Sequence, residues 1–462
     1  MHIIPQLRKL EHKYKRELVV IGVHSAKFTT ERETENVRQA VLRHNIEHPV
    51  VNDKGFVIWN QYGVRAWPTL VFIDPRGKII GMHAGEADFE DLDRVVARIV
   101  ETFDKDKAID RTPIAFKLEK HAMPPSLLSF PGKVLADEAS GRLIISDTNN
   151  NRIVVVSLRD GSVQAVIGSG AEGFADGAFD QAKLNHPQGV ALDGNILYIA
   201  DTENHSIRKA DLNKRTVETI AGTGRQSRDY GGFGGKAKET PLSSPWDLVL
   251  HQGTLYIAMA GFHQLWAMNL STGYVRPYAG SGREALIDGP LMDAALAQPS
   301  GLTTDGKRLY FADSESSSVR AVDLDPNGRV QTLVGPGTNT LFDFGDIDGV
   351  ADKARFQHPI GITYHDGVLY VADTYNHKIK RVDPTTRRAT TFVGTGKAGY
   401  ADGDTPLFFE PSGLSVAHGK LYVADTNNHL IRVVDLTTKR VTTLEVKGLA
   451  RARPTAVSDA AR

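Results

Sequence analysis

Aspartate and histidine recur at a fixed spacing in the second half of the chain, and both residue types can bind a metal ion. An asparagine directly precedes the histidine in three such pairs: Asp201 and His205, Asp373 and His377, and Asp425 and His429. Because carboxylates and imidazoles are suitable metal ligands, three pairs that converged on one point could form a metal site. The alternative is that each aspartate accepts backbone N–H groups within its own turn.

The number of copies favours the turn. Each pair belongs to a longer segment, such as LYVADTNNHLIRVVDL from Leu421, that occurs six times. One central metal site needs special residues in particular copies, whereas a turn needs the same residue in every copy. We therefore predict no metal site, no bound cofactor and no catalytic residue in these segments. The aspartates assigned to structural turns of the repeat are Asp147, Asp201, Asp313, Asp373 and Asp425.

The repeat predicts a β-propeller. Its six copies start 52 to 60 residues apart, at Leu143, Leu197, Leu255, Leu309, Leu369 and Leu421. Self-similarity at this period is typical of architectures in which each unit buries its apolar face against its neighbours. In the unit 358–396, polar turns separate four short runs with β-branched residues, which predicts a four-stranded antiparallel meander. Six meanders in series predict a six-bladed propeller.

Strand directions place the polar turns on one face of this propeller. The turn between the second and third strands and the long connection between units should share that face. Loops that a rigid scaffold holds in place often bind ligands. We therefore expect this face to bind a protein or a small molecule of unknown identity. The candidate binding residues there are His205, His263, Trp266, His377 and His429.

The third copy departs from the pattern, with Met259 in the aspartate position and Trp266 in the position of a basic residue. This departure could mark a contact surface or fill a local gap. In four of the other copies a basic residue recurs on the third strand, and we expect its side chain to span neighbouring blades with a packed stem. These residues are Arg208, Arg320, Lys380 and Arg432.

The repeated segments resemble the NHL repeat, which combines P-x-G-(V/I/L) with (L/V)-Y-(V/I)-A-D-(T/S)-x-N-x-x-(I/V)-(R/K). The match is close at Asp201, Asn204 and Arg208 and in the fifth and sixth copies. This resemblance covers residues 131–446, which we assign to an all-β, six-bladed NHL propeller. Residues 105–130 are expected to be a linker, and residues 447–462 a disordered tail.

The first hundred residues have an α/β pattern. Apolar periodicity and turn residues predict the order helix, strand, helix, strand, strand, helix, over 5–15, 17–24, 33–45, 69–74, 78–83 and from Asp88. With Trp67, Pro68 and Thr69 before the hairpin, residues 1–104 resemble a thioredoxin-like domain, in which the proline matching Pro68 is cis.

The two resemblances together point to the NHL repeat-containing protein 2 family, in which a thioredoxin-like domain precedes the propeller. In that family a Cys-x-x-Cys motif runs into a helix that begins Met-His, and residues 1–7 fit this helix from its start. The resemblance implies that the natural protein starts upstream, and that the domain here is incomplete, without its first strand and its cysteines.

Composition restricts the remaining chemistry. The chain has no cysteine, and its 55 basic side chains balance 55 acidic ones. We therefore expect no dithiol chemistry in this chain and no nucleic-acid partner. No apolar run is long enough to span a bilayer and no signal peptide is evident, so no membrane association and a cytoplasmic location are expected. Two G-x-G-x-x-G matches, from Gly168 and from Gly394, precede turns rather than helices and are assigned to loops.

Three functions remain open. The first is a binding or scaffold protein that uses the propeller face, with a thioredoxin-like module that is redox-inactive in this chain. The second is a thiol–disulfide oxidoreductase whose Cys-x-x-Cys lies in a missing N-terminal segment. The third, a lyase or hydrolase at the propeller channel, would rest on fold alone.

Overall fold

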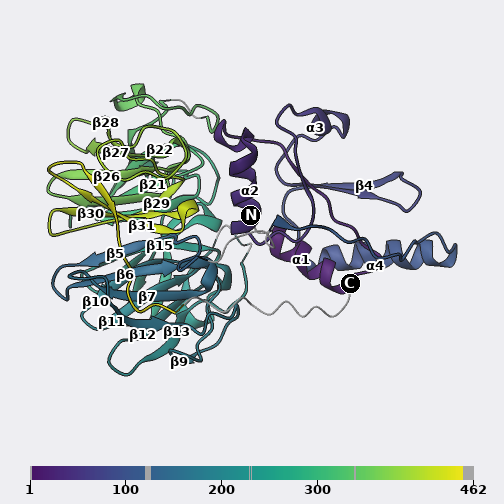
Figure 1. Cartoon of the computed structure of the whole chain (residues 1–462), viewed down its shortest axis with the longest axis horizontal. Helices are drawn as coiled ribbons and strands as arrows, with labels where there is room; N and C mark the ends of the chain where they lie inside the picture. Colours follow the sequence, from purple (N-terminus) through teal and green to yellow (C-terminus); the bar gives the residue numbers. More distant parts are fainter. Residues whose placement is uncertain (1–2, 120–125, 228, 230–231, 338–339, 451–462) are drawn as a thin grey trace. The chain divides into compact units, whose positions relative to one another are not determined.

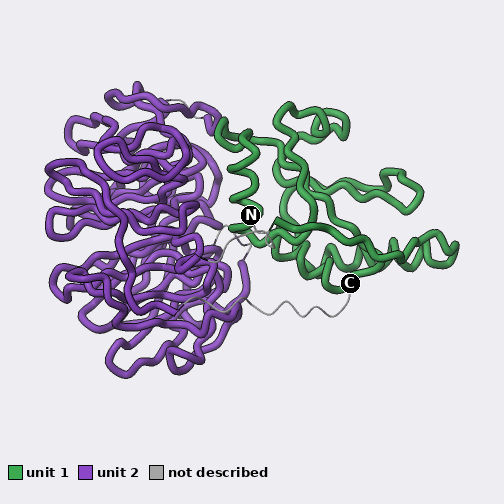
Figure 2. The backbone as a smooth tube through the Cα atoms, viewed as in Figure 1, with its two compact units in different colours: residues 1–125, 456–462 green, residues 126–455 purple. Residues whose placement is uncertain are grey.

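The computed structural model describes residues 3–119, 126–227, 229, 232–337 and 340–450. The chain forms two compact units, with the division between residues 125 and 126 (Figure 2). This division falls within the segment predicted as a linker. Within the described ranges, no helix has the length and apolar character that crossing a bilayer requires.

The first unit contains the predicted helices and strands, although the strand predicted over 17–24 covers only 22–24, and three further short elements, η1, β2 and α3. Its elements are, in order, α1 (Ile3–Lys13), β1 (Gly22–His24), η1 (Thr30–Arg32), α2 (Thr34–Arg43), β2 (Val50–Asn52), α3 (Val57–Gln61), β3 (Thr69–Ile73), β4 (Ile79–Ala84) and α4 (Phe89–Lys105). The α3 start depends on Asp53, whose carboxylate accepts the N–H groups of Ile58 and Trp59. A five-residue helix is too short to leave a periodic signal in the sequence.

The strands of this unit form two separate two-stranded sheets. Strand β1 pairs with β2 in parallel, and β3 pairs with β4 in an antiparallel hairpin. Helices α1 and α4 pack on one face of the hairpin, around Leu10, Leu92 and Leu70. The α4 helix begins at a capping residue, Asp88, whose carboxylate accepts the N–H of Asp91 at 3.0 Å.

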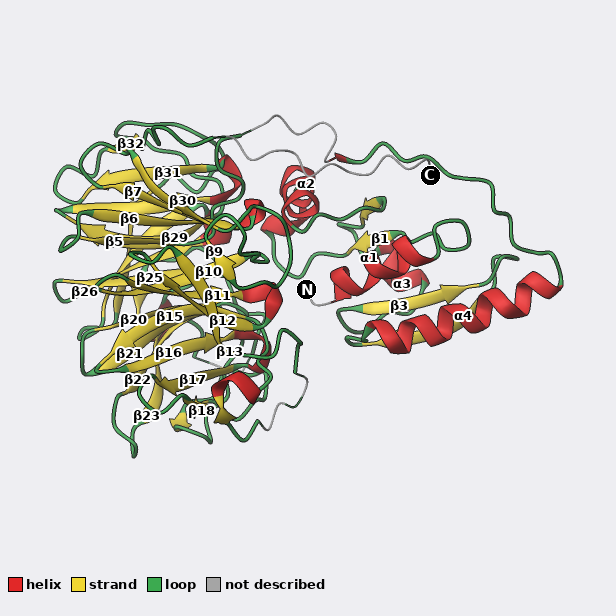
Figure 3. Ribbon diagram, turned by 90° about the horizontal axis from the view of Figure 1, so that it is seen from below, coloured by secondary structure: helices red, strands yellow, loops and turns green. Residues whose placement is uncertain are grey.

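The second unit is a six-bladed β-propeller, as predicted (Figures 1 and 3). Each blade is an antiparallel sheet that runs from the axis outward. The innermost strands are β5 (Val134–Asp137), β10 (Pro187–Asp193), β15 (Pro245–His251), β20 (Pro299–Thr304), β25 (Gly361–His365) and β29 (Pro411–Ala417). The second strands are β6 (Arg142–Asp147), β11 (Ile196–Asp201), β16 (Thr254–Met259), β21 (Arg308–Asp313), β26 (Val368–Asp373) and β30 (Lys420–Asp425).

The third and fourth strands complete each meander. The third strands are β7 (Arg152–Ser157), β12 (Ser206–Asp211), β17 (Gln264–Asn269), β22 (Ser318–Asp323), β27 (Lys378–Asp383) and β31 (Leu430–Asp435). The fourth strands are β8 (Val163–Ile167), β13 (Thr216–Ala221), β18 (Tyr274–Ala279), β23 (Arg329–Val334), β28 (Arg388–Val393) and β32 (Val441–Thr443). Apolar side chains from adjacent blades form the core between them.

Four blades carry a fifth short strand that the sequence did not predict. It comes from the connection that enters the blade and pairs with the fourth strand: β9 (Gly177–Ala178), β14 (Gly235–Lys236), β19 (Gly289–Pro290) and β24 (Gly349–Val350). In the first blade the C-terminal chain lies at the outer edge instead. There Lys447 accepts the N–H of Val163 and donates its own N–H to Gly161, each at 2.9 Å. Of the predicted tail, residues 451–462 lie outside the described residues.

Candidate functional site

The predicted turns lie between the second and third strands, at residues 147–151, 201–205, 259–263, 313–317, 373–377 and 425–429. We call the propeller face that carries them the turn face. One carboxylate oxygen of Asp201 accepts a hydrogen bond from the backbone N–H of Asn185 at 2.7 Å. The other accepts one from the side-chain amide of Asn204 at 2.8 Å. The same kind of backbone bond is made by the other turn aspartates: Asp147, Asp313, Asp373 and Asp425.

The basic residues of the third strands bond within their own blade, which corrects the expectation that they span neighbouring blades. The Arg208 guanidinium lies 2.7 Å from Asp201 and 2.8 Å from Asp176. Because Asp176 directly precedes β9, which pairs with β13, both carboxylates belong to the sheet of Arg208. Equivalent pairs of carboxylates hold Arg320 and Arg432.

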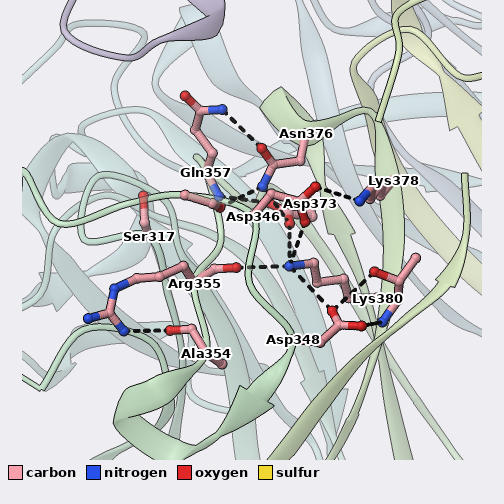
Figure 4. A network of polar contacts seen from close by, with 12 residues as sticks. Ser317, Asp346, Asp348, Ala354, Arg355, Gln357, Asp373, Asn376, Lys378 and Lys380 are labelled. Atoms are coloured by element: carbon pink, nitrogen blue, oxygen red, sulfur yellow. Dashed lines mark hydrogen bonds and ion pairs between the residues drawn. The ribbon is translucent and has the colours of Figure 1, made fainter. Parts of the chain in front are cut away.

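The fifth blade uses lysine for the same purpose (Figure 4). The Lys380 Nζ lies 3.1 Å from Asp346, 3.3 Å from Asp373 and 3.7 Å from Asp348, and it donates to the Arg355 carbonyl at 2.8 Å. Desolvation raises the pKa of Asp201, Asp373 and Asp425 to about 6, against the opposing effect of the basic partner and the amide donors. These charges are buried and bonded to one another.

The turn histidines join neighbouring blades rather than converging on one point. The Nδ1 atom of His205 accepts the N–H of Ser244 at 3.1 Å, His377 accepts that of Glu410 at 3.2 Å, and His429 accepts that of Phe130 at 3.0 Å. Each acceptor lies in one blade, and each donor directly precedes the proline of the P-x-G motif that begins the next blade. We call these bonds the blade latches.

Other residue types form the latch in two further blades. Asn151 accepts the N–H of His186 at 3.0 Å, and Ser317 accepts that of His358 at 3.3 Å. All these latch residues, and His263 at the same position, have left-handed backbone, with φ between 48° and 58°. Burial lowers the pKa of His377 and lowers that of His429 to about 4, which keeps the acceptor nitrogen unprotonated at neutral pH.

A hydroxyl latch adds to these bonds. The Thr202 hydroxyl donates to the carbonyl of Pro245 in the next blade at 2.7 Å. The same bond is made by Thr148, Ser314, Thr374 and Thr426. The third blade has Ala260 at this position, so the hydroxyl latch to the fourth blade is missing there.

Trp266 lies in the propeller core. Only 1% of Trp266 is exposed, and its ring stacks on Phe262 with the centroids 5.3 Å apart. The Trp266 Nε1–H donates to the side-chain oxygen of Gln264 at 2.9 Å. Met259 is also fully buried. Apolar side chains therefore take the place of the ion network in this blade, and Trp266 could contact a ligand only if the blade opened.

Among the described residues, no group of three or more His, Asp and Glu side chains has an arrangement that could hold a metal ion. The candidate binding residues His205, His377 and His429 lie in three different blades, and the Nδ1 atom of each accepts a backbone N–H. Their binding role stays a prediction.

The first unit has its own polar centre, around Pro68. The Trp67–Pro68 peptide bond is cis. The Trp67 indole donates to the Ser25 carbonyl at 2.8 Å and lies 4.5 Å from the Trp59 ring. The Ser25 hydroxyl in turn donates to Asp53 at 3.0 Å. These contacts tie the loop that precedes β3 to the end of β1.

The two sheets of this unit leave strand edges unpaired. In the described residues, β1 has a ladder only to β2, and β3 only to β4. Apolar side chains on these strands are about half exposed: Val23, Val51, Ile73 and Met82. Unpaired edges with exposed apolar side chains are a template for another strand.

Comparison with known proteins agrees with this architecture. A thioredoxin-like family model matches residues 1–79, and an NHL repeat model matches residues 184–210, 356–381 and 408–434. NHL repeat-containing protein 2 of Homo sapiens is 44% identical to this chain over 481 residues, which cover 96% of the chain and 66% of the human protein. The chain belongs to the NHL repeat-containing protein 2 family.

The chain spans about half to two thirds of the length of the relatives that it matches over nearly its whole sequence. Protein SUPPRESSOR OF QUENCHING 1 of Arabidopsis thaliana is 44% identical over 99% of this chain, and the match covers 45% of that protein. The thiol-disulfide oxidoreductase ResA of Halalkalibacterium halodurans is 29% identical over 85 residues, which cover 18% of this chain and 44% of ResA.

Sequence reasoning missed one further pair of residues, Lys133 and Asp247, whose side chains meet at 2.9 Å. The signal was present, because both residues replace the glycine of the P-x-G motif. It becomes visible only when the six motifs are aligned and the two exceptions carry opposite charges.

Proposed function

We propose that this chain is a binding scaffold in which the loops of the turn face recognise a protein or a small ligand, while the thioredoxin-like unit serves as a docking module. The observation that carries the proposal is the use of the repeat's polar side chains. Asp201 and Arg208 bond within their own blade, and His205 accepts a bond from the next blade. Side chains committed to these bonds are poor candidates for acid–base or metal chemistry.

Recognition would then depend on the connecting loops. They carry large exposed side chains, including Phe233 at 90% and Tyr400 at 54% exposure. Exposed aromatic residues are common in protein contact surfaces. The cytoplasmic location predicted from the sequence belongs to the same proposal, although the Arabidopsis relative is named as chloroplastic.

Site-specific photocrosslinking tests the proposal. A photoreactive residue at position 233 or 400 on the turn face is compared with one at Lys214 or Asp366, in turns of the opposite face. We expect a partner to be crosslinked from the turn face alone, and the purified partner to bind the chain saturably. Equal crosslinking from both faces, or no saturable binding by any crosslinked molecule, would contradict the proposal.

A second function is favoured by the unpaired edges of β1 and β3. One additional strand between them would pair both edges and join the two sheets, as a thioredoxin-like fold requires. In this alternative, a longer natural chain supplies that strand together with a Cys-x-x-Cys motif next to Pro68. The protein would then be a thiol–disulfide oxidoreductase.

Insulin reduction separates the two functions. The longer natural form, read from the genomic sequence upstream of Met1, is compared with its Cys→Ser variants and with the chain given. Activity that is lost in the serine variants supports the oxidoreductase. Equal background rates in all forms exclude it and leave the scaffold.

A further inference from the structure

Six residues surround the propeller axis at the third position of the P-x-G motif. We call them the axial ring: Lys133, Gly189, Asp247, Gly301, Gly361 and Gly413. Neighbouring members lie in close contact. A Cβ atom on Gly413 would lie 2.4 Å from the Lys133 Cα, and one on Gly189 would lie 2.4 Å from the Asp247 Cα. A side chain at Gly189 or Gly413 would therefore collide with the backbone of the neighbouring ring member.

The two ring members with side chains meet across this crowded axis. The Lys133 Nζ lies 2.9 Å from the Asp247 carboxylate, although the residues are 114 positions apart. The Lys133 side chain is 5% exposed, and that of Asp247 is 12% exposed. Because both charges are largely buried, removing either side chain would leave a buried charge without an opposite one, which is destabilising.

Oxygen atoms from three other blades surround the ammonium group. Besides Asp247 in the third blade, Nζ donates to the carbonyl of Ser300 at 2.7 Å in the fourth and to that of Ile360 at 3.3 Å at the start of the fifth. These three bonds use all three donors of the ammonium group. One carboxylate and two carbonyls form a cage that is complementary to a single positive charge.

The cage also spans the junction that lacks the hydroxyl latch. Asp247 accepts the N–H of Leu302 in the fourth blade at 3.0 Å. This bond crosses the junction between the third and fourth blades, where Ala260 leaves the hydroxyl latch unmade. Lys133 adds a connection from the first blade to the same point. The pair therefore ties four of the six blades together at the axis.

We propose that the propeller axis contains a monovalent cation site whose built-in occupant is the Lys133 ammonium. The site takes an external cation of similar size, such as NH4⁺ or K⁺, when that ammonium is removed. Carbonyl and carboxylate oxygens replace the hydration shell of such ions, and the single carboxylate balances one charge. In the wild-type chain the site is filled from within, so the axis is closed to external cations.

Chemical rescue tests this site. The Lys133→Gly variant restores the residue found at four ring positions and leaves Asp247 without its partner. Its thermal unfolding is followed by the fluorescence of Trp246 and Trp266, in a Trp59→Phe/Trp67→Phe background. The probe is NH4Cl, compared with choline chloride at equal ionic strength, since choline is too large for the cage. We expect NH4⁺ to raise the unfolding midpoint by about 3–5 °C, as for a ligand well above its dissociation constant.

Two controls define the outcome. For the wild type, NH4Cl and choline chloride should give the same unfolding midpoint, because the Lys133 ammonium fills the site. For the Lys133→Gly/Asp247→Gly variant, the two salts should also give one midpoint, because the site has lost its carboxylate. A variant with Lys133→Gly that folds but shows no difference between the salts overturns the proposal, as does an equal NH4⁺ effect in the double variant.

A measurement on the wild type keeps the test decisive if the glycine variant does not fold. Amine acetylation of the native chain, followed by peptide mapping, should leave Lys133 unmodified while exposed lysines such as Lys214 react. Urea should make Lys133 react at the rate of the others. Rapid native modification of Lys133 would show that its ammonium is not enclosed, and would overturn the proposal.

Discussion

The histidine latch between the sixth and first blades gives the sharpest test of how the propeller is held closed. The His429→Ala variant removes the acceptor of the Phe130 N–H and the edge-to-face ring contact between these residues, whose centroids lie 4.3 Å apart. It also places alanine at φ 58°. His429→Asn is the matched control, because asparagine forms the same latch at Asn151 and tolerates this backbone conformation.

The expected magnitudes differ between the two variants. An orphaned buried N–H costs about 1–3 kcal/mol, the lost ring contact costs about 0.5–1.5 kcal/mol, and the left-handed alanine costs about 1 kcal/mol. His429→Ala should therefore lower the free energy of unfolding by about 3–5 kcal/mol. His429→Asn keeps the bond and the backbone preference, so it should lose only about 1 kcal/mol from the ring contact.

Urea unfolding measures this difference. In the Trp59→Phe/Trp67→Phe background, fluorescence reports on the propeller alone, because the two remaining tryptophans lie in the third blade. Equal destabilisation by alanine and asparagine would refute the latch, since it would show that the hydrogen bond to Phe130 contributes nothing. A gap of about 2 kcal/mol or more, with alanine the weaker, is the predicted result.

Three further predictions follow from the same contacts. Burial lowers the pKa of His429 from 6.5 to about 4, so the stability that the neutral histidine contributes is present above pH 6.5 and is lost as the pH falls toward 4. The difference in unfolding free energy between the wild type and His429→Asn should therefore change by about 3 kcal/mol over this range, and an unchanged difference would contradict the pKa shift. Arg208→Met leaves the buried Asp201 carboxylate without its cation and should lower the free energy of unfolding in urea by at least about 3 kcal/mol. Adding Asp201→Asn should restore part of this loss, and a loss below about 1 kcal/mol in the single variant would argue against the network. Ala260→Thr should raise the free energy of unfolding by about 1 kcal/mol, because it supplies the missing hydroxyl latch, and Thr202→Ala should lower it by a similar amount. A loss of stability in Ala260→Thr would show that this junction cannot accept the bond.

The period and the turn residues were enough to predict the propeller. Six copies of one segment predict the number of blades, and the polar turns between short β-branched runs in the unit 358–396 predict the four strands of each. The resemblance around Trp67 and Pro68 likewise pointed to the thioredoxin-like unit, which the family match supports. These predictions succeeded because they depend on local pattern and on its repetition.

The partners of the polar residues could not be predicted in the same way. Arg208 and Asp176 are 32 positions apart, and their pairing depends on β9, a two-residue strand with no pattern of its own. His429 and Phe130 are 299 positions apart and meet because the propeller closes into a ring. Ring closure is a property of the whole fold, so the role of a single histidine in it cannot be inferred from the turn that contains it.

The central claim is that the Asp, Asn and His residues of the turns hold the propeller together and do not bind a metal. Equilibrium dialysis against Zn²⁺, Mn²⁺ and Ca²⁺, followed by elemental analysis, tests it most directly, with His205→Asn/His377→Asn/His429→Asn as the comparison. We expect no stoichiometric metal in either protein and little change in the stability of the variant. One equivalent of metal in the wild type that disappears in the variant would contradict the claim.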